Sequence, residues 1–528
     1  MKKSLAIMAF LGLFISSCSN DDSPSDPGGE IPTNPIEYTS GSADLSNFVS
    51  VGNSLAAGVS DQALFIEGQE ASFPLMMASS FSEAGGGDFT IPFMSDNLGG
   101  LNIGGQQRFP NRLILDFTTG SPTPTPVSGT PTTEATSVIG GPFNNMAVPG
   151  AKSYHLLANG YGNAAGLEAG LANPYYVRFA SSPSASVLGD ALAQNPTFFS
   201  LWIGSNDALF YAISGGSGTD QTGNLDPSTY GSNDISDPLV LASAYNTILE
   251  RLTANGAKGV IANIPDISQI PYFTTVPFNP LDPTNPAFGP QIPALNDQFA
   301  ALNNVFAFLG VPERSIVFST DAASALVIKD ESLTNLSNEI TATLIGGGLD
   351  APTATVLGLQ YGQARQANEN DRIVFPSQTV IAELNEENFA FLQSIGVPPQ
   401  TAGQLSVNGI TFPLEDQWVL TPDEQDAVTT AVDAYNQNIS ALAQLYDLAF
   451  VDMKAFYNLV ETEGIPLSDG SVVTDVYATG GGFSLDGIHP SPRGYALVAN
   501  EFIKAIEEKY GAVLPKVEPL DYKGLYIN

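Results

Sequence analysis

Four short apolar segments constrain the fold of this chain more than any other feature of its sequence. They read FVSVG from Phe48, TFFSLWIG from Thr197, GVIANI from Gly259 and LAFVDM from Leu448. Each is a run of apolar or β-branched residues with little alternation, which is typical of parallel strands that are buried on both faces. The sequence therefore predicts a sheet whose two faces are both covered.

Helical patterns lie between and after these runs. Residues 238–254 carry their large apolar side chains on one face and stop at an Asn-Gly C-cap signal. Residues 421–447 open with a capping box and a proline at the first helical position, and a last helix begins at Ser491. This order predicts an α/β fold, a three-layer α/β/α sandwich around a central, mostly parallel sheet.

Two stretches interrupt the alternation of strands and helices. Residues 84–140 contain glycine runs and the segment SPTPTPVSGTPTTEAT, which predicts a long loop and no core element. Residues 275–420 mix Pro-rich turns with one clear helical pattern between Leu295 and Phe306. We interpret both as insertions into one α/β domain, with a small subdomain or cap as the alternative for the second.

The N-terminus has the form of an export signal. Lys2 and Lys3 precede the apolar run LAIMAFLGLFI, and ISS then leads to Cys18, the only cysteine of the chain. This arrangement resembles a bacterial lipoprotein signal, in which residues 1–17 are removed and the cysteine is lipidated; a plain secretory signal is the alternative. We expect acyl chains on Cys18 to anchor the protein to a membrane without a spanning helix.

The segment after the signal predicts a disordered tether. Residues 18–46 are rich in Ser, Asp, Pro and Gly, and the globular domain would then cover 47–514, followed by a tail at 515–528. Asp21 and Asp22, just after the cysteine, resemble the surface-export signal of lipoproteins in the Bacteroidetes. We expect a location in the cell envelope, at the outer membrane and facing the surface, with a periplasmic orientation as the alternative.

Charge and composition exclude several classes of function. The chain carries 54 acidic against 18 basic residues, a net charge of −36, which repels phosphates, so we expect no nucleic-acid partner. With one cysteine and two histidines, His155 and His489, a zinc site of the His/Cys type is nearly excluded. A carboxylate-only Ca²⁺ or Mg²⁺ site stays open.

His489 is the stronger candidate of the two histidines. It lies in FSLDGIHPSPRGY, three residues after Asp486 and just before a predicted helix. A carboxylate at this position can hold the imidazole in one tautomer and leave its other nitrogen as a general base. The alternative is a solvent-exposed loop histidine. His155 we expect to be structural or on the surface, outside any site.

Three further motifs place polar or small residues where ligands bind in α/β proteins. Ser54, in VGNSLAAG, follows the first apolar run and is either a turn serine or a nucleophile. Asn206, in IGSND, follows the second run, where its amide could donate to an oxyanion or the segment could cap a helix. Gly150, in NMAVPGA, could offer a backbone N–H or satisfy a left-handed turn.

Taken in order, these motifs resemble the blocks of the SGNH, or GDSL-like, hydrolase family, and are most like its lipoproteins in the Bacteroidetes. The resemblance implies a flavodoxin-like sheet, with Ser54 as the nucleophile, His489 as the base and Asp486 as its orienting acid. It also implies an oxyanion hole from the backbone N–H groups of Ser54 and Gly150 and the amide of Asn206. No metal or other cofactor is expected.

The activity that the resemblance implies is that of a serine esterase or lipase acting on a lipid or an acylated glycan. A carbohydrate O-deacetylase and a catalytically silent glycan- or lipid-binding surface lipoprotein are the alternatives. Asn53 departs from the family pattern, which has aspartate before the serine. The apolar runs VFAFLGV and NFAFLQSIGV of the second insertion could line an acyl-binding groove or belong to ordinary core.

Overall fold

The computed structural model describes residues 36–118 and 122–528. The predicted signal peptide at 1–17, the lipidation site at Cys18 and most of the predicted tether lie outside the described residues. Within the described part, no helix has both the length and the apolar character needed to cross a membrane.

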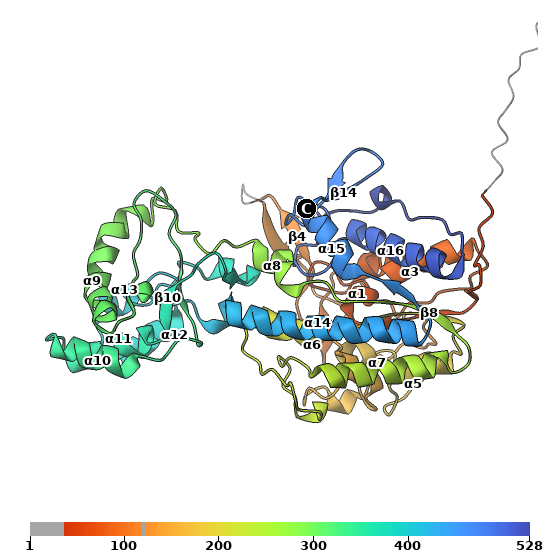
Figure 1. Ribbon diagram of the computed structural model, residues 1–528, viewed down its shortest axis with the longest axis horizontal. Coiled ribbons are helices and arrows are strands. Elements are labelled where there is room, and N and C mark those ends of the chain that lie inside the picture. Colours follow the sequence, from red (N-terminus) through yellow and green to blue (C-terminus); the bar gives the residue numbers. More distant parts are fainter. Residues whose placement is uncertain (1–35, 119–121) are drawn as a thin grey trace, which may run out of the picture. The chain divides into compact units, whose positions relative to one another are not determined.

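A parallel sheet of four strands organises the fold (Figure 1). In spatial order its strands are β1 (Phe48–Gly52), β7 (Phe198–Trp202), β8 (Lys258–Ala262) and β13 (Ala449–Val451). Neighbouring strands are parallel throughout. Three of them lie within the apolar runs of the sequence, and β8 begins one residue before its run, so the prediction of an α/β fold with a central parallel sheet is confirmed.

The side chains of the sheet alternate between two hydrophobic cores, one on each face. Phe199 and Leu201 of β7 belong to the first core, whereas Phe198 and Trp202 belong to the second. Helices cover both faces, as Figure 1 shows for α7 and α14 on one side and α3 and α16 on the other. Their bounds are α3 (Phe73–Ser82), α5 (Val187–Ala193), α7 (Pro238–Thr253), α14 (Pro422–Leu445) and α16 (Pro492–Tyr510).

The three helices predicted from their caps begin as expected. The side chain of Asp237 accepts from the second residue of α7, and that of Ser491 accepts from Gly494 of α16. Thr421 and Glu424 form the predicted capping box of α14. Short elements complete this region: α2 (Ile66–Glu70), α4 (Pro174–Val177), α8 (Pro271–Thr274), β14 (Ile465–Pro466) and β15 (Val472–Val473).

The first insertion contains more regular structure than its composition predicts. It forms β2 (Leu101–Ile103), β3 (Gln106–Phe109), β4 (Leu113–Asp116), β5 (Thr123–Pro126) and β6 (Thr133–Glu134). Strand β5 lies within the Pro/Thr-rich stretch and pairs with β4, and Leu101 is fully buried. The prediction of a long loop is therefore wrong here, because pairing with an apolar strand orders a segment of low intrinsic preference.

The second insertion builds a hydrophobic core of its own. This core extends from Val276 to Val419 and holds the predicted helix, α9 (Ile292–Phe308). Its separate core agrees with the subdomain alternative. The other elements of the insertion are β9 (Val327–Lys329), α10 (Ser337–Gly346), α11 (Ala351–Tyr361), β10 (Ala364–Gln366), β11 (Arg372–Ile373), α12 (Glu386–Ser394), α13 (Pro399–Gln404) and β12 (Val419–Leu420).

Both ends of the predicted domain need correction. The tether was expected to reach residue 46, but Thr39 pairs with Val513, and Leu45 is buried in the second core. The C-terminal tail was expected to be separate, but Ile527 pairs with Leu115 of β4. Backbone hydrogen bonds and burial thus extend the ordered fold at each end.

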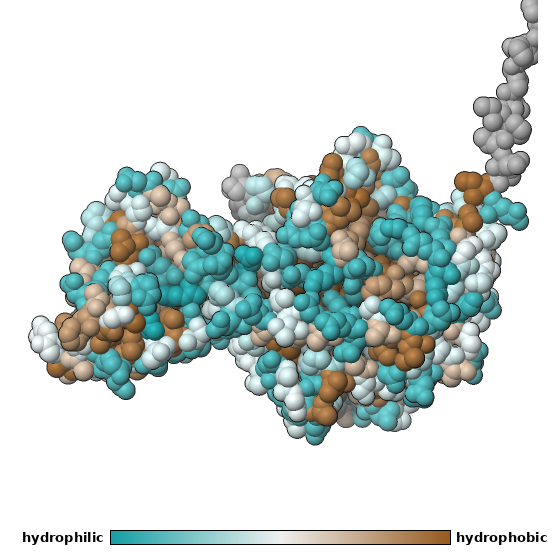
Figure 2. Space-filling model, viewed as in Figure 1, coloured by the Kyte–Doolittle hydropathy of each residue, from teal (hydrophilic) through white to brown (hydrophobic). Residues whose placement is uncertain are grey.

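The surface is mostly hydrophilic on the face that Figure 2 displays, with separate apolar patches. Four large apolar side chains of the second insertion are among those exposed, namely Phe308, Leu359, Phe391 and Ile395. Scattered exposed apolar residues of this kind are ordinary on folded proteins.

A buried ion-pair cluster stabilises the second insertion. Arg365 contacts Asp330 at 2.6 Å and Asp371 at 2.7 Å, and the two carboxylates are 5% and 0% exposed. We expect Arg365→Met to lower the free energy of opening of this core by about 3–5 kcal/mol, because two buried carboxylates lose their partner. Hydrogen exchange of the α9–α11 amides measures the change.

Arg108→Met is the matched control, because Arg108 and Glu168 are 3.8 Å apart and half or more exposed. An exposed pair contributes at most about 1 kcal/mol. Equal effects of the two substitutions would contradict the stabilising role of the buried cluster.

Candidate active site

Ser54 follows the first strand of the sheet directly. It is the first residue of the short helix α1 (Ser54–Ala57), whose N-cap is Asn53. At Gly52 an added Cβ would lie 2.7 Å from the carbonyl oxygen of Trp202, so only glycine fits where β1 and β7 run side by side. Ser54 is 9% exposed. The strand end and the cap together hold its side chain in one place.

Both polar atoms of the Asn53 side-chain amide are hydrogen-bonded. Its Oδ1 accepts from the backbone N–H of Leu55 at 3.1 Å, and its Nδ2 donates to Oγ of Ser205 at 2.8 Å. Since the residue is fully buried, both groups would be costly to leave unpaired. The amide therefore joins the loop after β1 to the loop after β7 without adding a charge.

His489 bridges the candidate nucleophile and the candidate acid. Its Nε2 lies 2.8 Å from Oγ of Ser54, and its Nδ1 lies 2.8 Å from Oδ2 of Asp486. Ser54 and His489 are 435 positions apart in the chain. The structure thus brings together all three residues predicted for the triad.

The carboxylate of Asp486 is buried among hydrogen-bond donors. Its Oδ1 accepts from the backbone N–H groups of Ile488 and His489, both at 2.8 Å. Burial alone would favour the protonated acid, but the charge and hydrogen bonds of His489 outweigh it and lower the pKa of Asp486 to about 2. Asp486 is therefore ionised at neutral pH and can orient the imidazole.

Two further contacts to this carboxylate were not predicted. The backbone N–H of Gln62 donates to Oδ2 of Asp486 at 2.8 Å, and the hydroxyl of Ser484 donates to Oδ1 at 3.0 Å. Gln62 and its neighbour Asp61 both have positive φ, 73° and 52°, which is uncommon outside glycine. Aspartate tolerates this conformation, but glutamine at positive φ is uncommon, so the sequence gives no clear signal for the turn.

The loop that carries Gly150 runs beside the first strand. The backbone N–H of Val148 donates to the carbonyl of Gly52 at 3.0 Å, and that of Met146 donates to Ser50 at 2.8 Å. Gly150 itself has a φ of 78°, a left-handed conformation that glycine adopts without strain. The loop therefore passes the end of β1, close to Ser54 at the start of α1.

Asn206 lies at the end of the neighbouring strand and begins α6 (Asn206–Ile213). Its Nδ2 donates to the carbonyl of Ala151 at 2.9 Å, so its amide lies against the loop of Gly150. An amide carries two hydrogens, and the second can donate to a bound group. In the described part of the chain, the backbone N–H groups of Ser54 and Gly150 have no hydrogen-bond partner.

A buried carboxylate fixes the loop of Gly150 further. The backbone N–H and the hydroxyl of Ser153 both donate to Asp207 at 2.8 Å, and Nζ of Lys152 donates to the carbonyl of Asp234 at 2.7 Å. Burial raises the pKa of Asp207 against the lowering effect of these donors. Sequence reasoning missed this support, although Asp207 directly follows Asn206 in the quoted motif.

His155 takes no part in this arrangement. Its Nδ1 accepts from the backbone N–H of Lys152 at 3.1 Å, and its ring stacks on Tyr161 at 4.8 Å between centroids. Burial, together with the charge of Lys152, lowers the pKa of His155 to about 4. The ring is neutral and structural, as expected.

A pocket opens beside the nucleophile. It has a volume of about 870 Å³, part of it open to solvent, and Ser54, Asn206 and His489 line it. The three side chains are therefore accessible to a substrate.

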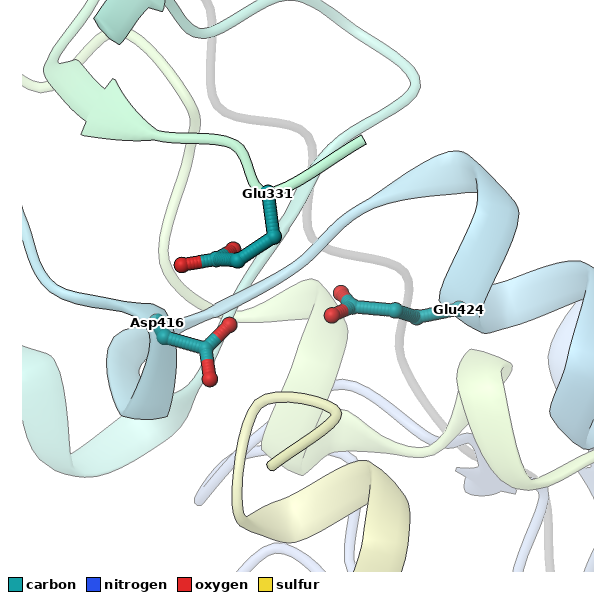
Figure 3. A group of neighbouring side chains, drawn as sticks. All are labelled: Glu331, Asp416 and Glu424. Carbon is teal, nitrogen blue, oxygen red and sulfur yellow. The ribbon is translucent and has the colours of Figure 1, made fainter. Parts of the chain in front are cut away.

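One group of acidic side chains outside this site has the spacing of metal ligands. Glu331, Asp416 and Glu424 have carboxylate oxygens within 4.8 Å of one another (Figure 3). Burial, and then the neighbouring carboxylates, raise the pKa of Asp416 to about 7, and burial raises that of Glu424 to about 7. Lys329 contacts Glu331 at 2.5 Å, so protons and a lysine can balance this charge without a cation.

Comparison with known proteins adds no relative to these observations. No family model, no curated protein and no solved structure matches the chain. The functional argument is therefore carried by the geometry around Ser54.

The carboxyl of Asp61 makes stability depend on pH. Burial is the main cause that raises its pKa from 3.8 to about 6, and the charge of Asp486 adds to it. Between these values the folded protein holds a proton that the unfolded chain has lost, so stability falls as pH rises from about 4 to about 6. Above pH 6 the folded protein bears the full loss of stability that comes from ionising the buried Asp61 carboxyl.

We expect Asp61→Asn to remove this dependence. The asparagine Oδ1 can still accept from Leu485, as Asp61 does at 3.1 Å. The stability of the variant relative to wild type should be more favourable at pH 8 than at pH 4 by about 2–4 kcal/mol. Urea unfolding at both pH values measures it, and an equal difference at both would contradict the raised pKa.

Proposed function

We propose that this protein is a serine hydrolase that cleaves carboxylic esters through an acyl-enzyme on Ser54. The observation that carries the proposal is the hydrogen-bonded chain from Ser54 through His489 to Asp486, with both ring nitrogens at 2.8 Å from their partners. A nucleophile, a base and an orienting acid in this geometry are the working parts of acyl transfer.

In the proposed reaction, Oγ of Ser54 attacks the ester carbonyl while Nε2 of His489 takes its proton. Asp486 accepts a hydrogen bond from Nδ1–H, which holds the tautomer and stabilises the imidazolium that forms. The protonated His489 then donates to the leaving alcohol. Water then attacks the acyl carbonyl while His489 takes its proton. The bond from the acyl carbon to Oγ breaks, His489 returns the proton to Ser54, and the acid leaves.

The negative charge on the carbonyl oxygen would be stabilised by the backbone N–H groups of Ser54 and Gly150 and the amide of Asn206. Among the described residues the two backbone N–H groups have no internal partner, and the bond from Asn206 to Ala151 at 2.9 Å holds its amide beside them; both observations support this role. Losing one donor of this kind typically lowers kcat by about 10²- to 10³-fold.

We assign the scaffold to the SGNH, or GDSL-like, hydrolases, with a flavodoxin-like three-layer sandwich. The order of the motifs along the chain and the parallel sheet between helices support the assignment. Lipidation of Cys18 and an outer-membrane location remain part of the proposal and rest on the N-terminal sequence. A catalytically silent binding protein would not need Ser54, His489 and Asp486 to be hydrogen-bonded to one another in this order.

The first test is hydrolysis of p-nitrophenyl acetate by the full-length protein. We expect turnover by the wild type and a loss of about 10⁴-fold or more in Ser54→Ala, because the nucleophile is gone. Ser79→Ala is the matched control, since Ser79 is exposed on helix α3. Activity that survives in Ser54→Ala would refute the nucleophile, and no turnover on any ester would refute the proposed function.

The second test concerns Asn53. In Asn53→Asp the Ser205 hydroxyl can rotate and donate to the new carboxylate, so we expect kcat/KM to stay within about tenfold of wild type. The added negative charge stabilises protonated His489, which should move the acidic limb of the pH–rate profile up by about one pH unit. An unchanged profile would show that Asn53 does not influence the base.

A further inference from the structure

The pocket beside Ser54 is almost entirely apolar, and this property points to a substrate class. We propose that it binds an apolar chain of the substrate, so that long-chain esters, and not acetylated carbohydrates, are what the enzyme cleaves. The inference rests on the proposed function and deepens it. It concerns a lining in which apolar side chains far outnumber polar ones.

One helix supplies a continuous apolar wall. Met453, Phe456, Tyr457 and Val460 of α15 (Met453–Thr462) all line the pocket. Their spacing of three and four residues places them on one face of the helix. The hydroxyl of Tyr457 donates to the carbonyl of Gln269 at 2.8 Å, so that this ring presents its apolar part to the space.

The parts of the lining that come from α16 and from the segment after β8 are apolar as well. Leu497 and Val498 of α16 line the pocket, and so do Ile264, Ile267 and Ile270 from the segment after β8. These five side chains are no more than 8% exposed. An apolar chain against these five side chains would lose its water shell without burying a polar side chain of that wall, which is the condition for favourable burial.

The polar residues of the lining do not suit a sugar. Ser54, Asn206 and His489 belong to the proposed reaction centre. Oδ1 of Asp266 accepts from the backbone N–H of Ser268 at 3.1 Å and from its hydroxyl at 2.9 Å, and the hydroxyl of Ser205 accepts from Asn53 at 2.8 Å. Sugar hydroxyls within the apolar part would lack partners, and each such loss disfavours binding strongly.

The insertions do not contribute to these walls. Every lining residue lies outside 84–140 and 275–420. The apolar runs that could have lined an acyl groove instead supply Phe306 to the core of the second insertion and Leu392 to a small cluster beside it. The pocket is therefore built by α15, α16 and the segments that follow the strands of the sheet.

Filling the pocket tests the inference. We expect the wild type to cleave p-nitrophenyl decanoate with a kcat/KM at least about tenfold above that for the acetate, since each buried methylene favours binding about fourfold. Val460→Trp should lower the decanoate-to-acetate ratio by at least about tenfold. A thermal unfolding temperature close to that of the wild type shows that the variant is folded.

Leu459→Trp is the matched control, because Leu459 is adjacent on α15 but 40% exposed and does not line the pocket. It should keep the wild-type ratio. A second series, acetates of butanol to decanol, distinguishes a chain in the alcohol part from a chain in the acyl part. Dependence on chain length that Val460→Trp abolishes in either series supports the inference, and a ratio unaffected by Val460→Trp overturns it.

Binding without turnover separates this inference from the proposed function. In the Ser54→Ala background, methyl decanoate should raise the thermal unfolding temperature, and Val460→Trp should abolish that rise while Leu459→Trp keeps it. If no ester is hydrolysed but this pattern holds, the proposed function fails and the chain-binding pocket stands. If methyl decanoate has no effect, the pocket assignment is overturned whether or not short esters are cleaved.

Discussion

The parallel alignment of three chain segments at one edge of the sheet is the constraint on which the candidate site depends. Gly52 of β1 pairs with Trp202 of β7, and the segment through Val148 bonds to the other side of Gly52. Parallel segments leave the sheet at the same end, so the residues that follow meet there. Ser54, Gly150 and Asn206 follow these three segments within four positions.

The acid of the triad depends on a second constraint, a buried charge that must be fully hydrogen-bonded. Asp486 receives donors from its own turn and from the Asp61–Gln62 turn, which lies 424 positions away. A buried carboxylate without such donors would be protonated and would not orient His489. The ionised state of Asp486 therefore depends on a contact between the turn after α1, near the start of the domain, and the His489 segment near its end.

Apolar burial performs two tasks in this protein. On both faces of the sheet it stabilises the fold, and beside Ser54 the same helices leave a space that their side chains do not fill. Protein interiors are otherwise close-packed. The unfilled apolar space next to the hydrogen-bonded Ser54 can therefore hold an apolar part of a ligand. The second insertion has a core of its own and takes no part in it.

The sequence by itself determined the four strands, the starts of α7, α14 and α16, and the pairing of Asp486 with His489, because these rest on local patterns of burial, capping and spacing. It did not predict the strands of the first insertion or the docked C-terminal tail, whose order comes from pairing with distant segments. The contact of Ser54 with His489 was predicted only through the resemblance to a family, and the turn that supports Asp486 and the apolar pocket were decided by the tertiary structure alone. These arise from residues far apart in the chain, and no local preference encodes which of them will meet.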